Sequence, residues 1–246
     1  MQNSKLKIQP NQTQIIFDDG KKVSLVDWQS KVRKRPNTTS GESKPNPEVK
    51  VVESNSDLEI QVSRDASLEY YFIWNNTSIN RSIIIHLNEE GANAKLTGVF
   101  TGDTDNAINL NSTMIHHAPH TTGNTLVKGA LNGSAKSDLK GMIKIDKHGQ
   151  GAEDLLTERI ILLSSKARAQ AEPTLEIDNN EVKATHAASV SKVNEEQLFY
   201  LRSRGLSEEQ GKNFIVQGFL QEVIDMFPRE VLPLSRNENL LPFNPS

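Results

Sequence analysis

The chain has 246 residues, 35% of them hydrophobic, and its 28 basic and 31 acidic side chains leave a net charge of -3. This length allows one or two domains with a sizeable core, while the charge gives no extended basic surface for nucleic acid, and no apolar run approaches the roughly 18 residues of a membrane span. The absence of cysteine excludes disulfides, zinc–thiolate sites and cysteine nucleophiles.

The N-terminal region, residues 1–28, has the pattern of a small β unit. Asp19 and Gly20 give a hairpin-type turn signal between β-prone runs at 15–17 and 23–26. Residues 29–48 are polar and rich in proline, so we predict a linker or loop. The first residues lack the apolar core of a secretion signal, and we therefore expect a cytoplasmic protein.

Residues 49–193 are predicted to form a β core, because short β-prone runs alternate with Gly, Asn, Asp and Ser. Alternation at Leu58, Ile60 and Val62 places one side of a strand inward. Many short strands fit a β-sandwich or a β-solenoid. Later apolar centres recur every 14–18 residues or so, which we interpret as one solenoid turn. These centres are Val127, Ile143, Ile161 and Leu175.

Residues 194–227 are predicted to form two helices. Asn194 and Ser207 are each followed three positions later by Gln, the spacing of a capping box. Gly205 lies where the first helix must stop, in a position that favours a left-handed backbone.

The second of these helices carries an apolar face and must pack on another surface. Its apolar residues are Phe214, Ile215, Phe219, Val223, Met226 and Phe227. Pro228 is expected to end the helix, and residues 228–246 are expected to form an extended tail.

Between residues 115 and 219 the chain resembles the SufB/SufD family of iron–sulfur cluster assembly scaffolds, and it is nearer to the SufD branch. Four segments carry the resemblance in the order found in that family. They are HHAPHTTGNTLVKGAL (116–131), TERIILLSSKARAQAEPTLEID (157–178), VKATHAASVSKV (182–193) and NEEQLFYLRSRGLSEE (194–209).

The resemblance implies a right-handed parallel β-helix core with a small C-terminal α-helical region, and a scaffold rather than an enzyme. In this family SufB and SufD pair, and each recruits a SufC ATPase. The chain is therefore expected to pair with a SufB-like subunit or with itself, and to dock a SufC-type ATPase through its helical region. The expected partner-binding residues are Phe199, Tyr200, Arg202, Arg204, Gly205 and Phe219.

His186 matches the histidine of the family's "SHGATVG" motif, which lies at the SufB–SufD interface and takes part in forming the nascent cluster. The resemblance thus implies a transient iron–sulfur cluster shared at an interface, with His186 as its metal-binding residue and no cluster held tightly by the isolated chain. Imidazole is a suitable iron ligand, although a lone histidine more often has a structural role. Two departures separate this chain from SufB: Ala187 follows the histidine, and Glu158 aligns with the SufB cysteine.

Three further histidines, His116, His117 and His120, form a cluster for which hydrogen-bonded structural roles are favoured over a metal site. His86 and His148 have no suggestive neighbours.

Two carboxylate pairs, Asp103 with Asp105 and Glu176 with Asp178, leave open a β-helix carbohydrate-active enzyme. Turn and outer-face roles are favoured for them. A third alternative is a reduced structural relative that has lost the cluster chemistry.

Overall fold

A computed structural model describes part of the backbone before residue 57, and both backbone and side chains of residues 57–228. The described N-terminal segments are 6–9, 12–17, 22–30 and 49–51. Most of the predicted linker, residues 31–48, and the predicted tail from residue 229 onward lie outside the described residues.

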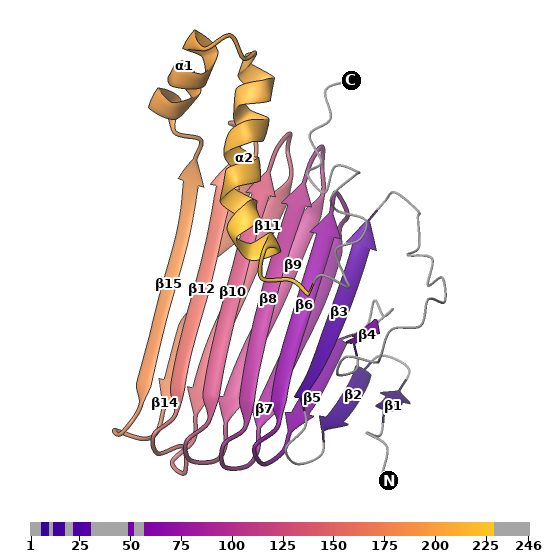
Figure 1. The fold of residues 1–246 in the computed structure, drawn as a ribbon, viewed down its shortest axis with the longest axis vertical. Coiled ribbons are helices and arrows are strands. Elements are labelled where there is room, and N and C mark those ends of the chain that lie inside the picture. The colour runs from indigo at the N-terminus through magenta and orange to yellow at the C-terminus, as the bar shows by residue number, and fades with distance from the viewer. Residues whose placement is uncertain (1–5, 10–11, 18–21, 31–48, 52–56, 229–246) are drawn as a thin grey trace.

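The described strands form two sheets that face each other along the molecule (Figure 1). Sheet A has the order β1-β2-β5-β7-β9-β11-β13, with β14 also beside β11, and sheet B has the order β15-β12-β10-β8-β6-β3-β4. The strands of sheet A are β1 (Leu6–Gln9), β2 (Gln12–Phe17), β5 (Asp57–Val62), β7 (Ile79–Leu87), β9 (Ala107–His116), β11 (Lys136–Ile145), β13 (Arg168–Ala171) and β14 (Thr174–Ile177). The strands of sheet B are β3 (Lys22–Ser30), β4 (Val49–Val51), β6 (Ser67–Asn75), β8 (Asn93–Gly102), β10 (Thr122–Leu131), β12 (Glu153–Leu162) and β15 (Lys183–Lys192).

From β5 to β12 the chain alternates between the sheets, and each strand pairs in parallel with the strand two positions later. Sandwiches are built instead from antiparallel strands, and among the described strands only β1 and β2 pair in this way. The fold is a parallel β-solenoid, as predicted.

The register corrects the expected turn length. Asn93 pairs with Thr122, and Thr122 with Glu153, so one full turn takes 29 and then 31 residues. The spacing of about 14–18 residues is therefore the half-turn from one sheet to the other, because the four apolar centres lie alternately in β10, β11, β12 and β14. Hydrophobic periodicity alone does not tell which strands become neighbours.

The predicted hairpin around Asp19 and Gly20 is wrong. β2 pairs with β1 and β5 in sheet A, whereas β3 pairs with β4 and β6 in sheet B. An Asp-Gly pair signals a tight turn, but it does not decide whether the flanking strands bond to each other or to successive turns of a solenoid.

The core fills the space between the sheets. Leu58, Ile60 and Val62 point inward, as their alternation predicts, and each is at most 1% exposed. Deeper in, an aromatic ring lies against a glycine of the next turn: Phe100 pairs with Gly129, where a Cβ atom would come within 2.1 Å of the ring. Only glycine leaves room for that close approach.

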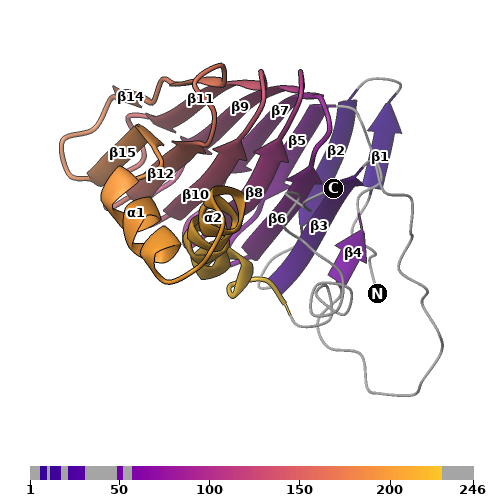
Figure 2. The same cartoon turned by 90° about the horizontal axis from the view of Figure 1, so that it is seen from above.

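The two helices are α1 (Glu195–Ser203) and α2 (Glu208–Ile224), and α2 lies on the outer face of sheet B (Figure 2). Both cap residues are as predicted: the Asn194 side chain accepts from two backbone N–H groups, and Ser207 accepts from the backbone of Gln210. The reciprocal capping box expected at both starts is formed at Ser207, where the Gln210 side chain also accepts from the cap backbone. Gly205 follows α1 with a φ of +95°. These local signals fix where each helix begins and where the first one ends.

Helix α2 ends at Ile224, one turn before Pro228, and not at the proline itself. Proline lacks an N–H, clashes with the carbonyl four residues earlier and disfavours helix at the residue before it. After Ile224 the chain therefore leaves the α-helix and forms a tighter turn, in which Phe227 N donates to Ile224 O. Neither helix of the described chain is long and apolar enough to cross a membrane.

The second half of strand β6 is buried on both sides, because α2 and the residues directly after it cover its outer face. Tyr71 and Ile73 point outward and join one cluster with α2, while Phe72 and Trp74 point inward. The Tyr71 ring lies 5.0 Å from that of Phe227, centroid to centroid. This contact explains why the sequence of β6 lacks polar alternation.

Candidate functional site

The last strand of the solenoid, β15, is an open edge. It pairs with β12 on one side, has no partner on the other among the described residues, and nine of its ten residues are exposed. An unpaired edge presents a row of backbone N–H and C=O groups to another chain. Because the edge is ten residues long, it offers a full strand's length for pairing.

Inward side chains of successive turns stack in columns, and the last side chain of each column has no further turn of the described chain to cover it. Val190 is the register partner of Ile160, and Ile177 is that of Ile145; both inner residues are fully buried, whereas Val190 and Ile177 are each 40% exposed. Solenoids normally need their terminal turn to be capped. The end of this solenoid therefore exposes apolar side chains that would be buried if another turn or another chain covered them.

His186 lies at this open end, on the inner side of β15. Its register partner is Leu156, which is 1% exposed inside the solenoid, whereas His186 itself is exposed. The described residues contain no group of three or more His, Cys, Asp or Glu side chains placed to hold one metal ion. Any metal ion bound at His186 would need further ligands from outside this part of the chain.

Glu158 lies one strand further in, on β12, where its register partner is Ala188. The side chain is 0% exposed, and neither carboxylate oxygen has a hydrogen-bond partner. Burial raises the pKa of Glu158 to about 7, because the ionised form is deprived of water. Gly141 on the opposite sheet makes room for it, since a Cβ atom there would come 2.9 Å from Oε1.

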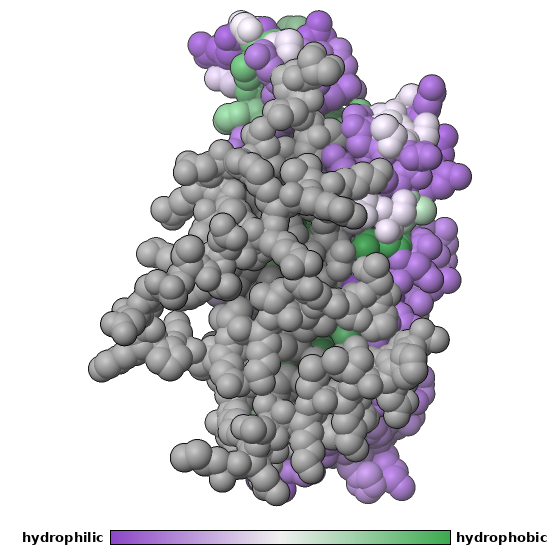
Figure 3. All heavy atoms as spheres, turned by 90° about the vertical axis from the view of Figure 1, so that its right-hand side faces the viewer, coloured by the Kyte–Doolittle hydropathy of each residue, from purple (hydrophilic) through white to green (hydrophobic). Residues whose placement is uncertain are grey.

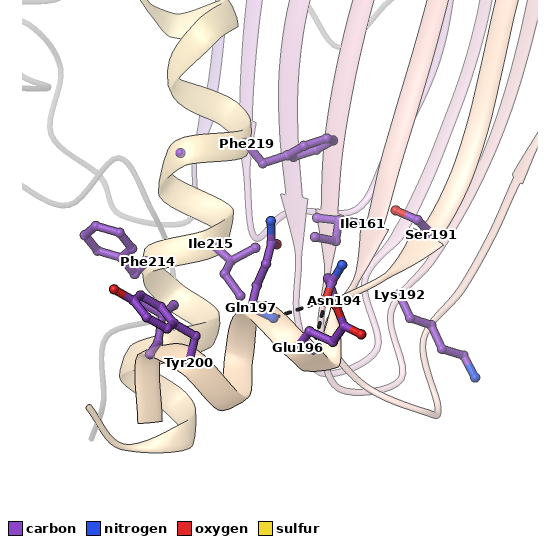
Figure 4. Close-up of a pocket in the computed structure, with 12 residues that line it drawn as sticks. Ile161, Ser191, Lys192, Asn194, Glu196, Gln197, Tyr200, Phe214, Ile215 and Phe219 are labelled. Carbon is purple, nitrogen blue, oxygen red and sulfur yellow. Dashed lines mark hydrogen bonds between the residues drawn. The ribbon is translucent and has the colours of Figure 1, made fainter. Parts of the chain in front are cut away.

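Helices α1 and α2 form a groove of about 750 Å³ with the ends of β12 and β15 (Figure 4). In Figure 4 Ile215 and Phe219 point from α2 towards Ile161, and Phe214 lies on the other side of the helix. The lining residues are Ile161, Ser191, Lys192, Asn194, Glu196, Gln197, Tyr200, Leu201, Phe214, Ile215, Gly218 and Phe219. Apolar surface also shows at this helical end of the molecule in the space-filling view (green at the top of Figure 3).

Large aromatic side chains of the helical region are unusually exposed: Phe199 is 74%, Tyr200 56% and Phe214 61% exposed. Of the expected partner-binding residues, the structure brings Tyr200 and Phe219 into the groove. Sequence reasoning placed Phe214 on the apolar face of α2, but did not select it as a binding residue.

The other expected partner residues lie outside the groove lining. Arg204 stacks over the Tyr200 ring at 5.2 Å, and Arg202 lies 4.0 Å from Glu208. Gly205 forms the turn between the helices. Neither these three residues nor Phe199 lines the groove.

Lys128 was missed by the sequence reasoning and anchors α2 to sheet B. It lies on β10 and is 3% exposed; its Nζ donates to Phe219 O at 3.0 Å and to Glu222 Oε2 at 2.5 Å. The ammonium also lies 4.8 Å from the centre of the Phe219 ring, and it lowers the pKa of Glu222. A lysine amid the apolar residues of a strand was the signal available in the sequence.

The predicted histidine cluster divides between the two faces of sheet A. His116 is fully buried, with Nε2 at 2.9 Å from Asp154 and Nδ1 at 2.8 Å from Thr121. It is thus a hydrogen-bonded structural residue, as favoured. His117 meets His86 on the outer face, so the expectation that His86 lacks a suggestive neighbour is wrong. His120 adopts a left-handed backbone, with a φ of 54°.

The carboxylate pairs occupy ordinary structural positions. Glu176 forms an ion pair with Lys144, and Asp103 accepts a hydrogen bond from Thr104 N. These contacts match the turn and outer-face roles favoured from the sequence.

Comparisons with known proteins agree with this architecture. The family described as "SUF system FeS cluster assembly, SufBD core domain" matches residues 1–219. The iron–sulfur cluster assembly protein SufD of Bacillus subtilis is 32% identical over 168 residues, which is 68% of this chain and 38% of that protein. SufBD family proteins of Mycobacterium leprae (32% identical, 66% of this chain and 44% of theirs) and Synechocystis (35%, 48% and 24%) are also similar.

The matched part spans less than half the length of these relatives. The family match, over residues 1–219, covers every described strand, helix α1, and α2 as far as residue 219. With the family match over most of its length and a parallel β-solenoid ending in two helices, the chain belongs to the SufBD family of iron–sulfur cluster assembly proteins.

Proposed function

We propose that this chain is a cytoplasmic scaffold subunit of a SUF complex, with one surface for a second SufBD-type subunit and another for a SufC-type ATPase. The second subunit is a SufB-like chain or another copy of this one. The observation that carries the proposal is the open end of the solenoid, where one edge of β15 has no partner among the described residues and inward side chains of the last turn are uncovered.

Pairing at this end is supported by two features that act together. The edge of β15 supplies backbone hydrogen-bonding groups, and Val190 and Ile177 supply apolar contact. Strand addition uses the backbone for affinity and side chains for specificity. A partner that continues the sheet would cover both features at once.

The proposed cluster role of His186 rests on the same interface. Iron and sulfide are the cargo of this protein, and the exposed imidazole is one nitrogen ligand for iron. The remaining ligands would come from the partner, so the cluster would be transient and shared. Glu158, buried one strand away, is not an exposed sulfur acceptor in the manner of a cysteine.

The aromatic groove is proposed as the ATPase-docking surface. It combines exposed rings with an anchor, Lys128, that holds α2 against the solenoid. Rigid aromatic side chains in a groove commonly carry most of the binding energy of an interface. Movement of a bound ATPase would therefore be transmitted to sheet B through α2.

The solenoid-end proposal is tested by charge placement on β15. Val190→Glu should abolish pairing with a co-expressed SufB-like subunit, or self-pairing, because it buries a carboxylate in the joined core. Thr185→Glu, on the outer side of the same strand, is the matched control and should pair normally. Mass determination by light scattering reads the outcome, and equal pairing by both variants would contradict the proposal.

The ATPase-docking proposal is tested by calorimetry with a purified SufC-type ATPase. Phe214→Ala and Tyr200→Ala should each weaken binding by about 30-fold, the effect of losing roughly 2 kcal/mol at an aromatic hot spot. Met226→Ala, just beyond the C-terminal end of α2 and 49% exposed, is the control. Unchanged binding by the groove variants would remove the groove from the docking surface.

The cluster role of His186 is tested separately. His186→Ala should leave the fold unchanged, because the side chain is exposed, but should lower the iron and sulfide content of the reconstituted complex. His148→Ala is the control, since His148 is exposed elsewhere on the solenoid. Equal iron and sulfide content in both variants would exclude His186 from cluster formation.

A further inference from the structure

Four titratable side chains form a continuous row across the outer face of sheet A. His86 Nε2 lies 3.4 Å from Glu59 Oε1, His86 Nδ1 lies 3.0 Å from His117 Nε2, and His117 Nδ1 lies 2.6 Å from Asp146 Oδ2. Their side chains are between 18% and 34% exposed. Each comes from a different turn, on or directly after β5, β7, β9 and β11.

The two imidazoles meet head-on. Their centroids are 5.3 Å apart and their planes differ by 6°, while the facing nitrogens are 3.0 Å apart. These nitrogens must therefore lie close to the line that joins the centroids, which makes the rings nearly coplanar and not face-to-face. An in-line N–N distance of 3.0 Å accommodates a proton, whereas a metal ion between them would need about 2 Å to each nitrogen.

Counting hydrogens gives the protonation state that satisfies all three contacts. Ionised carboxylates only accept, so His86 Nε2 and His117 Nδ1 must each carry a hydrogen. The central contact needs one more, which makes three hydrogens on two rings. With two hydrogens, one contact is left with lone pairs facing each other; with four, two N–H groups oppose each other at the centre.

We propose that Glu59, His86, His117 and Asp146 form a proton-dependent clasp that holds four successive turns of sheet A together while the two imidazoles share one extra proton. Backbone ladders join neighbouring turns one at a time, whereas this clasp links side chains across all four. Loss of the shared proton, or gain of a second one, breaks one of its contacts. The protonation state thus sets how firmly these turns are cross-linked.

The surrounding charges are consistent with a single extra proton. Burial and then the charge of His117 lower the pKa of His86, while Glu59 and Asp146 oppose that shift. Gln61 donates to Glu59 at 3.1 Å. Asp146 also acts on the charge of Lys144, which is paired with Glu176 and is influenced by Asp178 on the next turn. The lowered pKa of His86 means that gain of a second proton weakens the folded state, so this part of the stability is present above about pH 6.5, the unfolded value, and is lost as the pH falls through the folded pKa. Loss of the shared proton at higher pH is a separate step, and it removes the central contact.

The proposal is tested by ¹⁵N NMR of the full chain, in which only six histidines need assignment. Between pH 5 and 9 the pair should lose its protons in two separate steps, with a plateau at three ring protons and a coupling across the central N–H···N bond on that plateau. Asp146→Asn should shift the plateau to lower pH, because it removes a negative charge that holds the shared proton.

Two outcomes would overturn the proposal. One is independent titration of His86 and His117, without a plateau and without central coupling. The other is binding of Zn²⁺ at micromolar concentration with loss of the coupling, which would make the pair a metal site. Urea unfolding gives a second readout: the midpoint difference between wild type and His86→Leu should shrink as the pH falls below 6.5, whereas His148→Leu should give a flat difference.

Discussion

Replacing Glu158 by glutamine should remove a pH-dependent loss of stability. The structure raises the pKa of this carboxyl from 4.5 to about 7, and one pKa unit corresponds to about 1.36 kcal/mol. The folded state therefore binds the proton more tightly than the unfolded state by about 3 kcal/mol. Because the folded pKa is raised, this contribution is fully present below pH 4.5 and is lost as the pH rises through about 7.

The assay is urea unfolding, followed by circular dichroism, from pH 4.5 to 8.5. The free energy of unfolding of Glu158→Gln should rise relative to that of the wild type by about 3 kcal/mol across this range. The glutamine amide also lacks partners, but that cost does not vary with pH, so the slope of the difference is the observable. Glu153→Gln, at the exposed start of the same strand, is the control. Parallel curves for wild type and Glu158→Gln would refute the account of Glu158 as a buried, unpaired acid.

Two further predictions concern the packing of a glycine in the core and the ion pair that anchors α2. Gly129→Ala should destabilise the protein by about 2 kcal/mol or more, because its Cβ would come within 2.1 Å of the Phe100 ring; the control Gly218→Ala, with nothing within 4 Å, should stabilise α2 by about 1 kcal/mol. Thermal unfolding measures both, and equal effects would contradict the close-packing argument. Glu222→Ala should lower the free energy of unfolding by about 2 kcal/mol, because it leaves the buried ammonium of Lys128 without its carboxylate partner. Lys128→Met should lower it by less than about 1 kcal/mol, because the carboxylate that loses its partner is already in contact with water. Hydrogen exchange of the α2 amides measures which variant destabilises the helix more. A larger effect of Lys128→Met would show that the buried ammonium does not need the carboxylate of Glu222.

Features that depend on near neighbours in the chain could be predicted from the sequence. Alternation at residues 58–62 identified an inward strand face, and cap residues at Asn194 and Ser207 located both helix starts. The family resemblance supplied the solenoid, which periodicity alone favoured only modestly. It also supplied the expectation for His186, which the structure places at an exposed end without testing its chemistry.

What the sequence by itself determined is therefore local: strand faces, caps and the order of elements. Only the tertiary structure decided that the apolar spacing is a half-turn, that His86 meets His117, and that Glu158 is buried without a partner. Each of these depends on residues about thirty positions apart becoming neighbours, and that distance is set by how many residues each turn takes to return to its own sheet. Local patterns carry no record of that register, because it follows from the stacking of whole turns.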